Sequence, residues 1–189
     1  MKKNNINLPV FPLSIFLLPE GMTKLRIFEP RYLKMVSIAL KGRGFIIWAN
    51  SSHNLLSHPV WGSWVEIINF DQGADGVLEI DVKCKSLVEI DTVQTDSDNL
   101  HFGDIRQIKH WSQKKIDISI ADISKSLEDV FANNTNLNDL YPQKSINKPE
   151  WVIARWLELL PVDLDTKASF VVDSNFQKAK NFVTSVIYK

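Results

Sequence analysis

The sequence predicts an α+β protein, in which a small antiparallel β-barrel or sandwich with one inserted helix precedes a helical segment. Short apolar stretches joined by turn residues recur up to about Trp111, which is typical of such a sheet. One helical stripe interrupts them early, and after Trp111 the composition changes to helical patterns. With 189 residues the chain can bury a substantial core. We therefore expect a β-rich domain over residues 1–112 and a helical domain, packed on it, over residues 113–189.

Charge and cysteine content restrict the class of protein. Lysine plus arginine equals aspartate plus glutamate at 22 each, so the formal net charge is zero, which argues against a strongly electrostatic nucleic-acid binder. The single cysteine, Cys84, excludes an internal disulfide and fits a reducing compartment. No apolar run has the length of a signal peptide or a membrane span. We expect a cytoplasmic protein without a membrane segment.

The first helix begins at a proline and follows two extended stretches. Residues 8–18 are expected to form a strand whose prolines suit a sheet edge. Pro19 and Gly21 then indicate a turn, and Leu25, Ile27 and Phe28 a short extended apolar stretch. Glu29 and Pro30 begin the helix, because proline is favoured at the first helical position and an acid complements the helix dipole. Its apolar stripe consists of Tyr32, Met35, Val36, Ala39 and Leu40.

Four further strands and three helices follow from the pattern. The strands are expected at residues 45–49, 62–70, 78–90 and 100–111. The third of these has the clearest alternation, with Leu78, Ile80, Val82 and Cys84 on a buried face and Glu79, Asp81, Lys83 and Lys85 on a wet face. Helices are expected at residues 121–131, at 151–160 and from Phe176 to the C-terminal end, with a loop over residues 133–148. Pro161 ends the second helix, and Asp163 and Asp165 after it are expected to cap a helix.

Three short pieces near the beginning of the chain are recognisable together. They are Leu8-Pro9-Val10-Phe11-Pro12-Leu13, then Leu18-Pro19, then Ile27-Phe28-Glu29-Pro30-Arg31-Tyr32. In this order and spacing they resemble the start of the Lon protease amino-terminal domain. The resemblance continues through Gly62, the strand from Gly76 to Ile90, and the helices from Trp151 to the end, and it implies a PUA-like barrel followed by a helical subdomain. A glycine and an arginine that the family usually has near Cys84 and Leu87 are replaced here.

The resemblance also indicates a binding function without catalysis. No Gly-x-x-x-x-Gly-Lys-[Ser/Thr] phosphate loop occurs, and the chain stops where the ATPase and Ser-Lys protease domains of Lon would begin, so we expect no ATP and no enzyme activity. In Lon this domain contributes to substrate recognition. The implied partners are unfolded or partner polypeptides, bound by strand addition or in an apolar groove.

An alternative function is RNA binding, which a PUA-like architecture would suggest. Its candidate residues are a basic and aromatic cluster at Lys109, His110, Trp111, Lys114 and Lys115. The zero net charge argues against this function, so nucleic acid is an unlikely partner. A solvent-exposed strand end explains the cluster better.

Catalytic and metal sites are not expected. The four histidines are scattered, whereas a zinc site needs three or four convergent ligands, so we expect no metal and no cofactor. Cys84 lies on the apolar face of its strand, where a thiol is usually inert.

Tryptophans are the candidate binding residues. Trp48, Trp61 and Trp64 are candidates to line an apolar groove, and Trp61 and Trp64 are expected to be exposed beside the polar loop at residues 50–59. The alternative is that all three belong to the core. A structural role, holding the first helix to the barrel, is expected for Pro19, Phe28, Glu29, Pro30, Arg31 and Tyr32.

Overall fold

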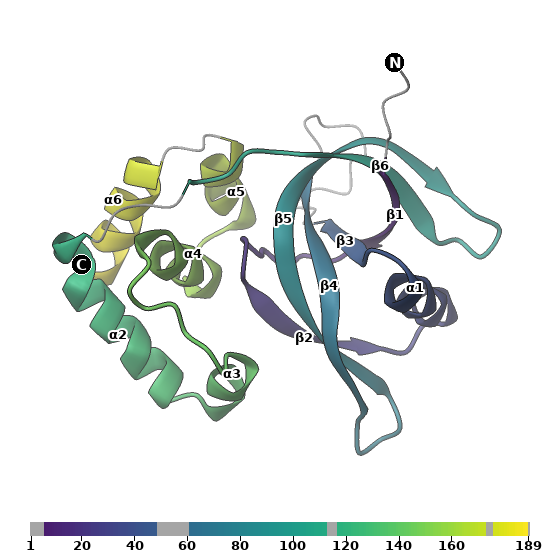
Figure 1. Cartoon of the computed structure of the whole chain (residues 1–189), viewed down its shortest axis with the longest axis horizontal. Coiled ribbons are helices and arrows are strands. Elements are labelled where there is room, and N and C mark those ends of the chain that lie inside the picture. The colour runs from purple at the N-terminus through teal and green to yellow at the C-terminus, as the bar shows by residue number, and fades with distance from the viewer. Residues whose placement is uncertain (1–5, 49–60, 113–116, 173–175, 189) are drawn as a thin grey trace. The chain divides into compact units, whose positions relative to one another are not determined.

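The computed structural model of the protein describes residues 6–48, 61–112, 117–172 and 176–188 (Figure 1). The chain divides into two compact units, Met1–Ile108 and Lys109–Lys189. The first unit contains all the strands described, and the second contains helices. The α+β class predicted from the sequence is confirmed. Packing of the helical part on the barrel stays a prediction.

The first unit is one mixed sheet with an inserted helix. Its elements are β1 (Ile6–Pro12), β2 (Met22–Ile27), α1 (Pro30–Lys41), β3 (Phe45–Trp48), β4 (Trp61–Gln72), β5 (Leu78–Thr95) and β6 (His101–Gln107). The strand order is β2-β5-β4-β3-β1-β6, and a second pairing of β5 with β6 joins the sheet into a barrel-like ring, with β2 outside it. The sequence predicted antiparallel pairing, but β1 and β3 are parallel because α1 and β2 lie between them in the chain.

Two predicted strands are shorter in the structure. The first ends at Pro12 rather than at residue 18, where its pairing with β3 ends at Trp48. The last ends at Gln107 rather than at Trp111. Immediately after it, the amide of Ile108 still donates to the carbonyl of Leu87 at 3.0 Å, but the chain then leaves the sheet.

The strand β5 is the longest and holds the turn that follows Leu18. The amide of Glu20 donates to the carbonyl of Cys84, and the amide of Cys84 donates to the carbonyl of Gly21, each at 2.8 Å. The amide of Gly21 in turn donates to Leu18 at 2.8 Å, and Glu20 has a φ of 67°. Cys84 itself is buried, as its alternation predicted. The turn is therefore fixed to the middle of the sheet before β2 begins.

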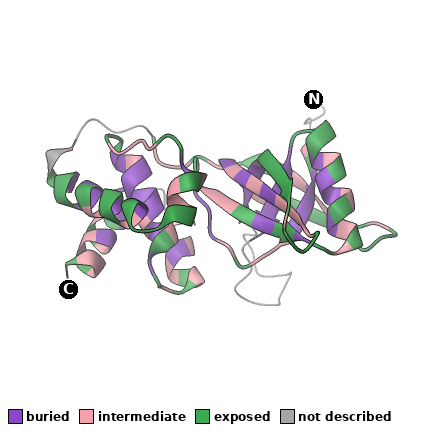
Figure 2. Ribbon diagram, turned by 90° about the horizontal axis from the view of Figure 1, so that it is seen from below, coloured by how far each residue is buried: buried purple, intermediate pink, exposed green. Residues whose placement is uncertain are grey.

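The barrel interior is apolar and closely packed. Its central cluster consists of Leu8, Val10, Ile46, Trp48, Trp64, Val88, Ile90 and Ile105. Gly44 allows β3 and β4 to approach, because its φ is +90° and a Cβ there would lie 1.9 Å from the carbonyl oxygen of Val65. Figure 2 shows buried residues gathered along these strands and on one side of α1. The core therefore sits within the ring and beneath the helix.

The second unit contains more helix than the sequence predicted. Its elements are a 3-10 turn (Ile118–Ile120), α2 (Ala121–Ala132), α3 (Thr135–Leu140), α4 (Pro149–Leu159), α5 (Leu164–Val172) and α6 (Phe176–Ile187). The helix α3 lies in a segment predicted to be a loop, and the Asn134 side chain caps it by accepting from the amide of Leu137 at 3.0 Å. Asp163 accepts from the amide of Thr166 at 2.7 Å at the start of α5, so the predicted capping role of Asp163 is confirmed.

Candidate functional site

The three candidate tryptophans are buried. Trp48, Trp61 and Trp64 are 5%, 8% and 7% exposed, so the prediction that Trp61 and Trp64 are exposed is wrong. Trp48 and Trp64 fill the barrel interior, and the ring of Trp61 meets that of Phe16 edge-on at 5.8 Å. Alternation places Trp64 on the inner face of β4, whereas Trp61, three residues earlier, lies on the opposite face and is buried against Phe16. The polar loop that suggested exposure lies outside the described residues. Ligand contact by these rings stays a prediction that their burial does not favour.

Trp64 also has a polar role. Its Nε1 donates to the carbonyl oxygen of Arg43 at 2.6 Å, and the Nζ of Lys85 lies 4.7 Å from the centre of its ring. A buried indole N–H needs such a partner. The bond fixes the main chain at Arg43, directly after α1.

The residues between Pro19 and Tyr32 that are expected to have a structural role differ in their surroundings. The buried ring of Tyr32 lies 4.3 Å from that of Phe11 in β1, so it packs α1 on the sheet. Arg31 donates from Nε to Glu29 at 2.9 Å, and its guanidinium lies 3.5 Å from the carbonyl oxygen of Asn99. Phe28 is 71% exposed and does not join the core. Pro19 and Pro30 occupy the turn after Leu18 and the first position of α1.

One end of the sheet projects beyond the ring and exposes large apolar side chains. We call it the outer sheet, formed by β2, residues 78–83 of β5 and residues 66–72 of β4. In Figure 1 the β4–β5 hairpin runs to a turn beyond β2. On β4, Phe70 is 62% exposed and Ile68, at a bulge in the register, is 45% exposed. Phe28 follows β2, whose last residue pairs with Leu78.

Charged side chains occur at both edges of the outer sheet but are denser on β2. On β4 they are Glu66, which lies 3.9 Å from Lys85, and Asp71. Along β2, Lys24 lies 3.0 Å from Asp81, and Arg26 pairs with Asp75 and lies 3.6 Å from Glu79. Such charged side chains protect an edge strand from further pairing. On β4, pairing with β3 involves residues 63–65, and within the described residues no strand pairs with the outer side of residues 66–72.

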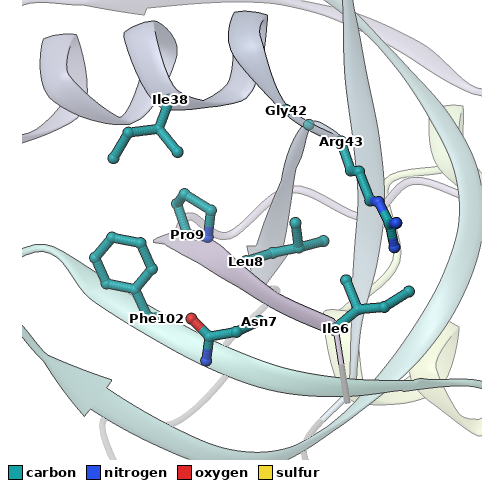
Figure 3. A pocket seen from close by; sticks show the side chains of 9 residues that line it. Ile6, Asn7, Leu8, Pro9, Ile38, Gly42, Arg43 and Phe102 are labelled. Atoms are coloured by element: carbon teal, nitrogen blue, oxygen red, sulfur yellow. The ribbon is translucent and has the colours of Figure 1, made fainter. Parts of the chain in front are cut away.

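A pocket of about 450 Å³ lies between β1 and the end of α1, and we call it the α1–β1 pocket (Figure 3). Its walls combine apolar side chains with polar and main-chain groups. They are formed by Ile6, Asn7, Leu8, Pro9, Ile38, Gly42, Arg43, Gly44 and Phe102. The pairing of β1 with β3 begins only at Val10 and Ile46, so the pocket occupies the place where these two segments diverge.

The described titratable groups include one histidine with a strongly lowered pKa. Within the described ranges, no three histidine, cysteine, aspartate or glutamate side chains converge as metal ligands would. Burial, together with the charge of Arg155, lowers the pKa of His110 to about 4, and its ring stacks on Trp111 at 4.4 Å. His110 and Trp111 are half-buried and stacked on each other, while residues 113–116 lie outside the described residues.

The family model described as the ATP-dependent protease La (LON) substrate-binding domain matches residues 7–171. The chain belongs to this family. The crystal structure of a Lon N-terminal domain protein from Xanthomonas campestris matches 95% of this chain and 98% of its own, with a TM-score of 0.73 and 23% identity. The N terminal domain of the Lon protease of the Mycobacterium avium complex matches 95% of this chain and 97% of its own, with a TM-score of 0.62 and 9% identity. No curated protein matches the chain.

These findings confirm the resemblance to Lon that the opening motifs indicated, and the two structures show that the fold is shared. No helix within the described ranges has the length and apolarity needed to cross a membrane. For a Lon substrate-binding domain, the surfaces of interest are the outer sheet and the α1–β1 pocket, and sequence reasoning missed both. For the outer sheet, the alternation around Phe70 could have indicated an exposed apolar residue near a turn. The α1–β1 pocket has no such signal in the sequence, because it depends on where β1 and β3 diverge.

Proposed function

We propose that this chain is a non-catalytic module that binds segments of other polypeptides. Membership in the Lon substrate-binding domain family supports this function. The absence of a phosphate-loop motif from the sequence supports binding without ATP. The family and the reducing environment suited to a single thiol support a place in the cytoplasm.

The observation that carries the proposal is the edge of β4 over residues 66–72, which pairs with no strand among the described residues. An extended polypeptide adds to such an edge through main-chain hydrogen bonds, which require no particular sequence. Phe70 and Ile68, exposed on the same segment, supply apolar contact for side chains of the incoming strand. The opposite edge is less suited, because Lys24 and Arg26 and their acidic partners occupy it. This combination favours extended, partly apolar segments of unfolded proteins.

Binding of a permanently unfolded polypeptide tests this function. The probe is fluorescently labelled, reduced and carboxymethylated α-lactalbumin, and fluorescence anisotropy measures its Kd. We expect saturable binding that Phe70→Ser and Ile68→Ser each weaken about fivefold or more, as for central apolar residues of an interface. Leu40→Ser is the matched control, because Leu40 is 52% exposed but belongs to α1.

Equal losses in all three variants would assign the binding to general surface hydrophobicity. A lack of saturable binding by the unmodified chain would refute the function. We do not propose RNA binding, because the net charge is zero and the aromatic residues of the basic cluster are packed. A salt-dependent gel-shift that retained RNA would reverse that choice.

A further inference from the structure

The α1–β1 pocket contains main-chain groups that the sheet leaves unpaired. The amide of Leu13, just after β1, donates to the carbonyl of Trp48 in β3 at 3.1 Å. Main-chain groups that face one neighbouring strand recur at every second residue, so the N–H and C=O of Asn7 face the side of β3 as well. The pairing with β3 begins only at Val10. Asn7 therefore presents a donor and an acceptor to the pocket, as a strand edge does.

An arginine lies on the rim of the same pocket. Arg43 is exposed, and within the described part of the chain its guanidinium has no ion pair. Its main chain is fixed, because its carbonyl accepts from Trp64 and the next residue is Gly44, which is held against Val65. Figure 3 shows its side chain at one side of the pocket, with Ile6 below it. A fixed main chain lowers the cost of placing the guanidinium on a ligand.

The remaining walls accept an apolar group. Ile38 of α1 and Phe102 of β6 point toward Pro9 across the pocket in Figure 3. A volume of about 450 Å³ lies toward the lower end of the range for small-ligand pockets, and suits one or two residues better than a long segment. The ligand must therefore combine an apolar part, a group for the guanidinium, and both a donor and an acceptor for Asn7.

We propose that the α1–β1 pocket binds the C-terminal residue of a polypeptide with an apolar side chain. Its carboxylate accepts from the guanidinium of Arg43 and from the amide of Asn7, and its own amide donates to the carbonyl of Asn7. Charge-assisted arginine–carboxylate bonds are among the stronger hydrogen bonds, and terminal carboxylates are a recurrent target of unpaired amides. The inference rests on the proposed function in that the ligand is a polypeptide, but it uses a surface separate from the outer sheet.

Two negatively charged groups near the pocket would repel a carboxylate, so its binding depends on Arg43. Asp104 on β6 accepts from the side-chain amide of Asn7 at 2.8 Å and from the hydroxyl of Thr92 at 3.1 Å. The C-terminal end of α1 carries partial negative charge, which Lys41 in its last turn offsets. Without the guanidinium, a carboxylate would meet these groups unpaired. Removal of its charge should therefore abolish the preference for a free carboxyl end.

Two matched peptides test the proposal by fluorescence anisotropy. Both consist of alternating glycine and serine, carry a fluorophore at the amino end and finish in leucine, and one has a C-terminal amide. We expect the free acid to bind about tenfold or more tightly than the amide. Arg43→Gln should remove this difference by weakening the acid alone. Lys41→Gln is the control for loss of a positive charge on the same turn. Because Lys41 does not line the pocket, Lys41→Gln should weaken the acid less than Arg43→Gln does.

Three results would overturn the inference. Equal Kd values for acid and amide would do so, as would equal loss in Arg43→Gln and Lys41→Gln. Competition by octanoate as strong as that by the acid peptide would show that any aliphatic carboxylate suffices. Unfolded α-lactalbumin with an amidated C-terminus separates the two proposals. If it binds with Phe70 dependence while the short peptides do not discriminate, the proposed function stands and the pocket assignment fails.

The opposite pair of results would support the pocket assignment and exclude the outer sheet. If the free acid binds through Arg43 while the amidated unfolded protein does not bind, the pocket assignment stands and the outer sheet is excluded. Thermal unfolding of each variant confirms that the fold is retained, which is expected because Arg43 and Lys41 are both exposed.

Discussion

The Nζ of Lys34 in α1 lies 2.7 Å from the carboxylate of Asp96, in the turn that joins β5 to β6. The same ammonium pairs with Asp98. The other oxygen of Asp96 accepts from the amides of Asp98 and Leu100, each at 2.9 Å. Lys34 and these amides hold the pKa of Asp96 below its usual range. One carboxylate thus both shapes a turn and links it to the helix.

Replacement of Asp96 should separate these two roles. Asp96→Asn keeps an oxygen for the amide of Leu100 but loses the charge that pairs with Lys34, whereas Asp96→Ala loses both. We expect a lower midpoint of thermal unfolding for both variants, with the larger decrease for Asp96→Ala, because unsatisfied amides cost more than a surface ion pair. Circular dichroism measures the midpoints. Equal decreases would show that the turn bonds contribute little.

Gly44 and Gly76 provide a matched pair with positive φ. A Cβ at Gly44 would lie 1.9 Å from the oxygen of Val65, whereas the nearest atom to a Cβ at Gly76, in Gln72, is 3.6 Å away. Left-handed backbone costs an alanine about 1 kcal/mol, which is what we expect for Gly76→Ala. Gly44→Ala adds a main-chain collision and should cost about 3 kcal/mol or more.

Urea unfolding measures both free energies. If the two substitutions cost the same, the close approach of β3 and β4 at Gly44 is not required. Gly44→Ala should also displace Arg43, and so weaken the acid peptide more than its amide in the binding assay of the α1–β1 pocket.

The sequence predicted the elements that have a strong period and missed what depends on distant neighbours. Alternation from Leu78 to Cys84 located β5 and its buried face correctly, and the stripe from Tyr32 located α1. The helix α3 was missed because asparagine-rich composition outweighed the capping position of Asn134. The sequence predicted no helix between Pro161 and Phe176, where α5 lies, although it predicted a capping role for Asp163.

The burial of the tryptophans also depends on residues distant in the sequence and was not predicted. A neighbouring polar loop suggested exposure for Trp61 and Trp64, yet Trp64 lies in the barrel core and Trp61 is buried against Phe16. Sequence reasoning considers one strand at a time, whereas burial within a ring depends on all of them. The same holds for the α1–β1 pocket, whose walls come from β1, α1 and β6.

His110 should make the helical unit sensitive to acid. Its folded pKa of about 4 lies below the ordinary value of 6.5, so the unfolded state binds the extra proton between these values. Stability is therefore complete above about pH 6.5 and decreases as the pH falls toward 4, by at most about 3 kcal/mol. His110→Phe keeps an aromatic ring against Trp111 but cannot take up a proton.

The measurement is the difference in unfolding free energy between the two proteins at several pH values. The unmodified chain should lose stability relative to His110→Phe between pH 6.5 and 4, and the difference should be constant above pH 7. A difference independent of pH throughout would contradict the burial of the neutral imidazole.

Asp117 should make stability depend on pH at a lower pH than His110 does. Its carboxylate lies 2.6 Å from the Nζ of Lys180 in α6 and accepts from the hydroxyl of Ser119 at 2.6 Å, which together lower its pKa to about 2. Because the folded pKa is depressed, the stabilisation is complete above about pH 4 and is lost as the pH falls through 2. The site is largely solvated, so we expect Asp117→Asn to cost only about 1 kcal/mol at neutral pH. That cost should disappear near pH 2, and Lys180→Met should reproduce it at neutral pH if the ion pair is its source.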